Sequence, residues 1–462
     1  MLEKLFKLKE NNTNVRTEVI AGLTTFFAMS YILFVNPSIL SNTGMNPQAV
    51  FMATVIGSAI GTLMMAFYAN LPLGLAPGMG LNAFFTYTVC LGLGFKWQEA
   101  LAMVLICGVV AAVLTLTKLR IKIINAIPRV LQHSIGAGIG IFVGYIGLKS
   151  LGILQFSETS AGFTTGAAAV PGIAVFNNAP LLIGVAGLII TIILVVKKVP
   201  ASIFIGIIVT TIIAIPFGLV HFDQITPPAE SFKALGHTFG AVFGPNGFAS
   251  LIADPSRYAT VLMAILAFVL TDMFDAIGTF IGTARKMLGA TKSQTEDVFA
   301  DKNLGPRLER GLVADFAASI TGAICGTSNV TCYVESAAGV AVGGRTGLTG
   351  VVVAGMFLIS GFFSPLIGIV PGAATAPALV IVGILMTGSL KLIDFDDFAT
   401  AAPCFFACFF MSFAYSITYG IATAFILYVI IQIAIGKWRT ISPVIYVVTL
   451  LFIIDFIFTA VL

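Results

Sequence analysis

The sequence predicts an all-α membrane protein whose chain crosses the bilayer many times. Of the 462 residues, 58% are hydrophobic and only 10% are charged, and the mean hydropathy is +1.04. Soluble domains carry roughly 25% charged residues, so a soluble fold is excluded. The apolar residues occur in runs of about 18 to 25, the length of a helix that crosses a hydrocarbon core, without the alternation of a membrane β-barrel. We therefore expect a polytopic bundle of helices.

Fourteen apolar segments are predicted as membrane spans. A further tail at 437–462 contains an apolar run at 442–460 that either crosses once more or lies along the interface. Asp455 within this run argues mildly against a crossing that is exposed to lipid. The fourteen predicted spans are 17–36, 50–68, 73–91, 98–117, 124–148, 180–196, 201–220, 258–284, 308–325, 329–343, 347–369, 373–390, 398–415 and 417–436.

The positions of Lys and Arg predict the orientation of these spans. With a cytoplasmic N-terminus, all of the 24 except Lys96, Lys149, Lys233 and Arg257 lie at the inner ends of spans or in inner loops. Such a bias marks the cytoplasmic side of a membrane protein, so we expect a multi-pass protein of the inner, or plasma, membrane. The loops 149–179 and 221–257 are then external caps. The polar connection 285–307 lies inside and divides the chain into two halves.

Segments three and ten, each the third of its half, are interrupted. Segment three reads LPLGLAPGMGLNAFFTYTV and segment ten reads GTSNVTCYVESAAGVAVGG, so neither forms one continuous helix. Unwound backbone at this depth is tolerated where it is buried in protein or lines a cavity. A pair of broken segments at matching positions of two halves is typical of a transporter's substrate site. The alternative is a pair of kinked helices packed by small residues.

Acidic residues fall in the same part of the chain. Segment eight contains FVLTDMFDAIGTFIGTARK, in which Asp272, Asp275, Thr279 and Gly282 form one stripe of a helix. A carboxylate at the bilayer centre costs roughly 2.5 to 3.5 kcal/mol and usually faces a substrate or ion path. Asp275 is therefore a candidate site residue, with a bond to a neighbouring helix as the alternative. For Asp272 the functional and the structural roles have equal weight.

Glu335 is the acid of segment ten. It follows the broken stretch TSNVTC and is expected to begin the second half of that segment. Free backbone N–H groups concentrate at a helix start, where they stabilise an acid. A carboxylate that served packing alone would be costly at this depth, so a functional role is favoured over a structural one.

Other classes of protein find little support in the sequence. The three histidines are scattered, and the six cysteines lie in apolar segments without metal-ligand spacing. We therefore expect neither an enzyme nor a bound metal or organic cofactor. The net charge of +4 is explained by the orientation of the spans, so nucleic acid is not implied. Two lone acids on broken spans suit alternating access better than a channel.

Four motifs carry a family resemblance. PGMGLNAFF, FDAIGTFIGTARK, GLVADFAASITGAICGTSNVTCYVESAAG and GGRTGLTG resemble, in the same order, those of the azaguanine-like purine permeases, a branch of the nucleobase-ascorbate transporter superfamily. The similarity covers nearly the whole chain. It implies two inverted seven-span repeats, with short antiparallel strands in spans three and ten. It also implies a core domain from 17–117 (spans 1–4) and 258–369 (spans 8–11), and a gate domain from 124–220 (spans 5–7) and 373–436 (spans 12–14).

The resemblance also implies which residues bind substrate. The family's substrate-binding acid of span eight falls on Asp275, and its second acid falls on Glu335. The strand backbone that contacts the base falls around Ala83 and Phe84 in span three and at Val334 in span ten.

Two further positions bear on the branch and on the coupling. Thr279 stands where the uracil and xanthine branches carry another polar or ionisable residue, which favours the purine branch. Asp315, in GLVADF, matches an acid of the wider superfamily at the start of span nine. If Asp275 and Glu335 face one poorly solvated cavity, both cannot comfortably be ionised. We expect Glu335 to carry the coupling proton, with Asp272 and Asp315 as the other candidates.

These expectations combine into one function. We expect a secondary transporter that imports adenine, hypoxanthine and/or guanine by proton symport, with the base and the lipid bilayer as its partners. The oligomeric state is left open, with a homodimer allowed. A uracil or xanthine permease is the alternative, as is an anion transporter of the same fold. The anion transporter is disfavoured because the central charges of the spans are acids, without Lys or Arg.

Overall fold

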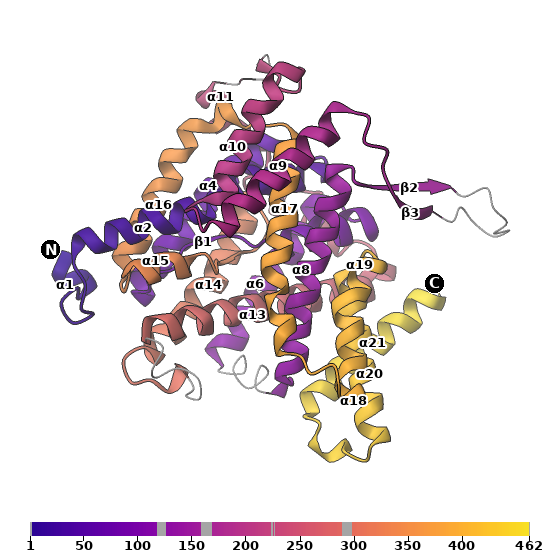
Figure 1. Cartoon of the computed structure of the whole chain (residues 1–462). Coiled ribbons are helices and arrows are strands. Elements are labelled where there is room, and N and C mark those ends of the chain that lie inside the picture. Colours follow the sequence, from indigo (N-terminus) through magenta and orange to yellow (C-terminus); the bar gives the residue numbers. More distant parts are fainter. Residues whose placement is uncertain are drawn as a thin grey trace.

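The protein is a bundle of helices with four short strands in the part of the chain that the structure describes (Figure 1). This computed structural model describes residues 2–117, 126–158, 169–222, 225, 227–288 and 298–461. Nine helices of the described residues are long and apolar enough to cross a membrane, and three shorter apolar helices accompany them. The prediction of a multi-pass helical membrane protein is confirmed in this coarse form.

The first half of the chain alternates long helices with short irregular elements. Two of its helices, α4 and α5, continue as π-helices over Met65–Ala69 and Phe84–Gly92. The elements are α1 (Leu2–Phe6), α2 (Val15–Met29), α3 (Ile32–Leu40), α4 (Pro47–Met64), β1 (Leu75–Pro77), α5 (Met79–Ala83), α6 (Trp97–Leu116), α8 (Arg129–Leu151), β2 (Leu154–Glu158), β3 (Ala169–Ile173), α9 (Ala179–Val196), α10 (Ser202–Ala214), α11 (Pro228–Ala234) and α12 (Phe248–Leu251).

The second half begins with the longest helix of the described residues. Several of its helices end in 3₁₀ or π turns, as at Gly361–Leu366, Thr387–Leu392 and Phe406–Phe410. The elements are α13 (Tyr258–Leu288), α14 (Gly305–Cys325), β4 (Val330–Cys332), α15 (Ser336–Val342), α16 (Gly347–Ser360), α17 (Gly372–Met386), α18 (Phe398–Phe405), α19 (Met411–Phe413), α20 (Ile417–Ala434) and α21 (Pro443–Val461).

Polar side chains cap the helices that begin at the ends of apolar segments. Each caps its helix by accepting a hydrogen bond from a backbone N–H of the first turn, one of the groups that otherwise lack a helical partner. Asn46 and Asn178 each precede a helix with Pro in its first two positions, where the missing N–H of Pro costs no hydrogen bond. The capping residues are Asn14, Asn46, Asn178, Thr346 and Asp397.

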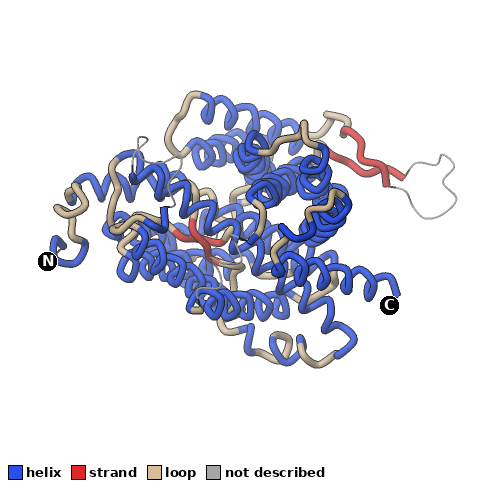
Figure 2. Tube along the Cα trace, turned by 90° about the horizontal axis from the view of Figure 1, so that it is seen from below, coloured by secondary structure: helices blue, strands red, loops and turns tan. Residues whose placement is uncertain are grey.

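Strands β1 and β4 join the two halves of the chain at the centre of the bundle. They pair antiparallel, with Leu75 opposite Cys332 and Pro77 opposite Val330, and all six residues are buried. Helices surround this pair on all sides in the view from below (Figure 2). The prediction of short strands in spans three and ten is therefore confirmed.

The strand in span three lies earlier than the resemblance placed it. Ala83 ends α5 and Phe84 begins the π-helix, so both residues are helical. The strand ends at Pro77, and the extended Gly78 donates one more hydrogen bond, from its N–H to the Asn329 carbonyl oxygen at 2.9 Å, before α5 begins. The glycines and prolines that break the segment therefore confine the strand to its first part.

Helices pack in two groups. The strand-pair bundle consists of α2–α6 and α13–α16 around β1 and β4, and the α8–α17 bundle consists of α8–α10 and α17–α20. Glycines bring α8 and α17 together, because a Cβ at Gly383 would lie 2.6 Å from the Cα of Gly144 and one at Gly140 would lie 2.5 Å from the Cβ of Met386. Small residues of this kind drive close helix packing in membranes.

The two long loops contain structure that the sequence did not predict. Strands β2 and β3 form an antiparallel hairpin in the loop 149–179, and this hairpin projects from the helical body (Figures 1 and 2). The loop 221–257 contains the short helices α11 and α12 among 3₁₀ turns. Of the polar connection 285–307, residues 289–297 lie outside the described part of the chain.

The apolar tail forms helix α21, which packs antiparallel against α20. The ring of Phe456 stacks on that of Tyr419 at 5.6 Å, and Phe452 lies 6.1 Å from Phe425. Contacts near the end of α21 are thus made with the beginning of α20, and Phe452 is fully buried. The side chain of Asp455 lies outside the described residues.

This packing predicts the topology of the C-terminus. A helix that runs beside a membrane span in the opposite direction crosses with it, so α21 should return the chain to the side where α20 begins. A cysteine at Lys437, in the exposed α20–α21 connection, and a cysteine added after Leu462 should react with an impermeant maleimide from opposite sides of the membrane. Labelling of both cysteines from one side would mean that α21 lies along the interface.

Candidate functional site

Asp275 and Glu335 lie beside the strand pair, Glu335 at the start of the half-helix α15 and Asp275 on the continuous helix α13. Glu335 precedes α15 and is half-buried. Asp275, also half-buried, lies on α13 with its Oδ2 atom 3.5 Å from the point where a Cβ on Gly78 would be, and Gly78 precedes α5. The two carboxyls interact electrostatically with each other. The structure therefore brings together the two acids that the sequence predicted, beside the first turns of α5 and α15, where the helix dipoles favour negative charge.

Tyr31 is a site residue that the sequence analysis missed. It lies at the break between α2 and α3, is 1% exposed, and donates a hydrogen bond from Oη to Oε1 of Glu335 at 2.7 Å. Its ring lies 6.4 Å from that of Tyr333. A tyrosine in an apolar segment carries no charge to mark it, so only the interruption of the first span, between α2 and α3, could have drawn attention to it.

Tyr333 and the strand pair fix the backbone of this site. The Tyr333 hydroxyl donates to the carbonyl oxygen of Pro77 at 2.6 Å, and its backbone N–H donates to the carbonyl oxygen of Gly74 at 3.0 Å. The Ser336 hydroxyl accepts a hydrogen bond from the Gly74 N–H at 3.0 Å. These bonds hold both unwound segments in one arrangement, and they satisfy polar groups that are buried away from water.

Asp315 lies behind the strands. It is fully buried on α14 and accepts hydrogen bonds from the Thr331 hydroxyl at 3.0 Å and from the Cys332 N–H at 3.2 Å. It also interacts electrostatically with Asp275. Asp315 therefore supports β4 from the side of α14. Asp272 is fully buried on α13, about one turn before Asp275.

The other predicted site residues differ in their exposure. Val334, next to Glu335, is 59% exposed, whereas Thr279 on α13 is 5% exposed. Ala83 and Phe84 are buried, and the Phe84 ring packs edge to face against Phe268 at 4.6 Å. In this conformation Val334 borders open space near the acids, and the Phe84 ring is covered by α13.

One face of α13 is open from Asp275 towards the C-terminal end of the helix. Every residue from 267 to 273 is buried, whereas Gly278, Gly282 and Arg285 are exposed. A Cβ added at Gly278 or at Gly282 would meet no atom within 4 Å. These residues follow one another at helical spacing on the face of Asp275. One face of α13 is therefore exposed from the position of Asp275 to Arg285.

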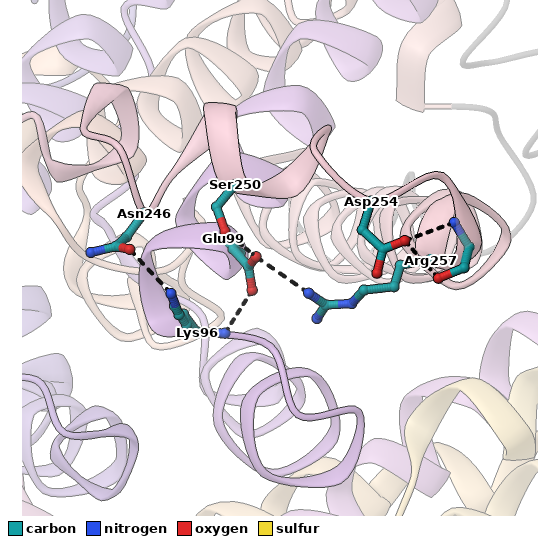
Figure 3. A network of polar contacts seen from close by, with 7 residues as sticks. Lys96, Glu99, Asn246, Ser250, Asp254 and Arg257 are labelled. Carbon is teal, nitrogen blue, oxygen red and sulfur yellow. Dashed lines mark hydrogen bonds and ion pairs between the residues drawn. The ribbon is translucent and has the colours of Figure 1, made fainter.

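A buried carboxylate fixes the chain just before α13 (Figure 3). Glu99 is 1% exposed near the start of α6 and accepts hydrogen bonds from the Lys96 N–H at 2.9 Å and from the Ser250 hydroxyl at 2.7 Å. It also forms an ion pair with Arg257 at 3.4 Å, and the guanidinium lies 3.9 Å from the centre of the Phe95 ring. The start of the helix that carries Asp275 is thus anchored to α6.

The described residues give no indication of a metal centre. No group of three or more His, Cys, Asp or Glu side chains within them is arranged to hold an ion. All six cysteines are buried thiols, and none of them forms a disulfide. The chemistry of the site is that of two carboxyls, two tyrosine hydroxyls and backbone groups, which are able to donate and accept hydrogen bonds.

The Tyr31 to Glu335 hydrogen bond can be tested by Tyr31→Phe. This change removes the hydroxyl and keeps the buried ring, so Glu335 loses its fixed orientation. A hydrogen bond of this kind contributes about 1 kcal/mol, so we expect ligand affinity to fall about fivefold and the pH dependence of transport to shift. Binding and transport should be measured on the purified, reconstituted protein. An unchanged affinity together with an unchanged pH profile would contradict this role.

Comparison with known proteins places the chain in a family. A family model described as "Permease family" matches residues 16–423. The adenine permease AdeP of Escherichia coli is 39% identical over 459 residues, which cover 99% of this chain and 96% of that protein. The guanine/hypoxanthine permease PbuO of Bacillus subtilis is 40% identical over 457 residues, which cover 98% of this chain and 99% of that protein.

Solved structures show the same fold at low identity. The transmembrane domain of the cyanobacterial bicarbonate transporter BicA superposes with a TM-score of 0.61 and 14% identity, covering 89% of this chain and 97% of that chain. The structure of SLC26A9 gives a TM-score of 0.57 at 12% identity, covering 91% of this chain and 65% of that chain. The family match and the bacterial relatives together show that the chain belongs to the permease family, in its purine permease branch.

Proposed function

We propose that this protein is a transporter of purine nucleobases that couples uptake of the base to a proton. A permease of this family is a transporter and not an enzyme, and its relatives include permeases named for adenine and for guanine and hypoxanthine. The observation that supports the proposal most strongly is the meeting of Asp275 and Glu335 at the starts of two half-helices. This is the arrangement expected for a substrate site at the membrane midplane.

The chemistry of this site suits a neutral purine. A carboxylate at Asp275 accepts hydrogen bonds from ring N–H groups, and N–H groups at the start of α5 donate to ring nitrogens or a carbonyl oxygen. Val334, exposed beside the acids, offers an apolar contact for the plane of the base. Ala83 and Phe84 are buried, with the Phe84 ring against Phe268 of α13, and Thr279 lies on α13 one turn after Asp275.

An anion would be bound less well. Asp275 interacts electrostatically with Glu335 and with Asp315, and Asp315 is hydrogen-bonded to β4. Among the described residues, no cation is paired with Asp275 or Glu335. Like charges without a counter-ion repel an anionic ligand. The likeness to bicarbonate and SLC26 transporters therefore concerns the fold only. A uracil or xanthine permease is the remaining alternative, and the names of the relatives favour purines.

We propose alternating access between two domains. The core domain corresponds to 17–117 and 258–369 and the gate domain to 124–220 and 373–436, as two inverted repeats of seven spans. The packing of the strand-pair bundle and the α8–α17 bundle as separate groups supports this division. In it, the site moves with the core domain while the gate domain stays in place. The proposal includes a homodimer, which would provide a stable gate domain.

We propose that the N-terminus is cytoplasmic and that the protein lies in the plasma membrane. The charge bias of the loops supports this orientation. The open face of α13 then leads from Asp275 to the cytoplasm, because the helix ends in Arg285 and Lys286 and continues into the polar connection. With this orientation, the cysteine at Lys437 proposed above should react only from the cytoplasmic side.

Glu335 is the proposed coupling residue. Tyr31 holds its Oε1 atom, which leaves Oε2 to exchange a proton with the open side of the site. Asp315 is engaged with the backbone and side chain of β4, so a change of its protonation would disturb the strand pair. Asp272 is fully buried and is the alternative carrier. One proton moved inward gains about 2.3 kcal/mol per 100 mV, enough to concentrate a neutral base several tens-fold.

Uptake measurements test the function directly. Cells that lack their own permeases should accumulate radiolabelled adenine, hypoxanthine or guanine when they express this chain, and a protonophore should abolish the accumulation. Uracil and xanthine serve as the competing substrates. Uptake restricted to uracil or xanthine, or accumulation that persists with the protonophore, would refute the corresponding part of the proposal.

Substrate recognition is tested by Asp275→Asn. The change keeps the size of the side chain and removes the charge, so the charge-assisted hydrogen bond to the base is lost. Such bonds contribute roughly 1.5 to 3 kcal/mol, and we expect purine affinity to fall at least about tenfold. Binding should be measured on purified protein whose expression and thermal stability match the parent. Affinity close to that of the parent would exclude Asp275 as the recognition residue.

Proton coupling is tested by Glu335→Gln. Glutamine resembles the protonated acid at every pH, so the variant should bind purines and exchange them across the membrane while failing to accumulate them against a gradient. Uptake by the parent should decline as external pH rises, because the proton is a co-substrate, and the variant should show a flat profile. Exchange and net uptake should be compared in the same proteoliposomes. Full gradient-driven accumulation by the variant would transfer the coupling role to Asp272 or Asp315.

A further inference from the structure

A cluster of aromatic rings surrounds Tyr415, at the turn between α19 and α20. Three rings approach it in edge-to-face orientation: Phe142 at 5.6 Å, Tyr87 at 5.8 Å and Tyr145 at 6.1 Å between centroids. Edge-to-face pairs at such distances are attractive beyond the area they bury. Tyr415 is therefore the centre of a four-ring contact, which we call the Tyr415 cluster.

A lysine completes the cluster. Lys149, exposed near the end of α8, places its Nζ atom 4.6 Å from the centre of the Tyr415 ring and 3.4 Å from its hydroxyl oxygen. An ammonium group over an aromatic face is attracted to the ring's electron density. On the other side of the cluster, the Asn42 side-chain amide donates to the Tyr87 hydroxyl at 3.5 Å.

The cluster connects the two packing groups. Asn42 follows α3 and Tyr87 lies in the π-helix after α5, so both belong to the strand-pair bundle. Phe142, Tyr145 and Lys149 lie on α8, and Tyr415 precedes α20, in the α8–α17 bundle. The contact between Tyr87 and Tyr415 therefore has to break whenever one group moves past the other at this end.

The backbone of Tyr415 adopts an uncommon conformation. Its φ of 52° lies in the left-handed region that a residue with a Cβ rarely adopts. Such conformations persist where surrounding contacts enforce them, and they concentrate at functional positions. Here this conformation directs the ring towards Tyr87 and α8. The backbone angle is therefore a second observation, besides the ring contacts, that marks Tyr415.

The two ends of the site differ in access. The face of α13 beyond Asp275 is open over Gly278, Gly282 and Arg285. At the other end, Tyr87 is 8% exposed and Thr88, the residue after it, is 3% exposed. The Tyr415 cluster lies at this second end, where the helices α3 and α8 finish. The structure is thus open on one side of the acids and closed on the other.

From this geometry we infer that the Tyr415 cluster is the outer gate of the transporter, closed in this conformation, and that it parts to admit substrate from outside. The inference rests on the proposed orientation, in which Lys149 is external. Tyr87 moves with the strand-pair bundle, and Tyr415 and Lys149 stay with the α8–α17 bundle. Loss of the Tyr415 ring would shift the protein towards the conformation that is open to the outside.

A cysteine at Thr88 reports on this gate. Thr88 borders a shallow hollow with Met263 and Ser416, between the two packing groups, and it becomes accessible when they separate. The six native cysteines are buried and should be replaced by alanine in a chain that still transports. An impermeant maleimide applied to intact cells then measures the rate of labelling at position 88 from outside.

Four chains should be compared: the parent, Tyr415→Gly, Tyr415→Phe and Tyr428→Ala. Tyr415→Gly removes the ring and tolerates the left-handed backbone, so it endangers folding less than alanine would. It should speed labelling about three- to tenfold, the factor that the loss of an aromatic pair implies. Tyr415→Phe keeps the rings and should label close to the parent rate. Tyr428, half-buried on α20 outside the cluster, is the matched control and should leave the rate unchanged.

The outcomes separate this inference from the proposed function. Purine binding by each purified variant is measured in parallel, because it depends on Asp275 and Glu335 and not on the gate. Faster labelling in Tyr415→Gly alone supports the gate. Normal purine binding with equal labelling rates in Tyr415→Gly and the parent overturns the gate and leaves the function intact. Equal acceleration in Tyr428→Ala also overturns it, because the effect would then reflect general loosening.

Discussion

The pairing of β1 with β4 is the interaction on which the rest of the structure depends. Each strand has only three residues, and both are buried, so their backbone groups need hydrogen-bond partners within the protein. Their antiparallel bonds, the Tyr333 hydroxyl bond to Pro77 and the support of Asp315 satisfy polar groups that the two broken spans release. Because one strand comes from each half of the chain, this pair also fixes the halves to each other.

The position of the acids follows from that pairing. Since the strands meet at the centre, the half-helices α5 and α15 both begin there, and the positive ends of their helix dipoles make it a favourable place for carboxyls. Asp275 reaches the same point from α13, close to Gly78, where any side chain would occupy the space beside its Oδ2 atom. The site is therefore a consequence of two interrupted spans and one continuous span that meet, and Tyr31 completes it from a third interruption.

Features that cost free energy at their own position, such as a charge in an apolar span, could be predicted from the sequence. Features that depend on contacts with residues far away in the sequence could not. Charge is expensive in the bilayer and Gly and Pro break helices, so Asp275, Glu335 and the broken spans were visible in the sequence. Tyr31 and Tyr415 look like ordinary apolar residues until a carboxyl 304 positions away and a lysine 266 positions away come into contact with them. The strand was placed at Ala83 by analogy, while Pro77 ends it earlier. The hairpin β2–β3 has no charge pattern to mark it, and the structure alone revealed it.

The breaks in spans three and ten, which build the site, also explain why the two ends of the site can differ in access. The segment after β1 runs from the acids through α5 and the π-helix to Tyr87, and the segment after β4 runs from the acids through α15 in the opposite direction. One half-helix therefore leads to the closed end and the other to the open end, and both are attached to the same strand pair. In the proposed mechanism, a movement of that pair relative to α8 and α20 would change access at both ends at once, because both half-helices are attached to the same strand pair. Alternating access would then need only a rigid site, because the two openings of the site lie at opposite ends of the strand-pair bundle.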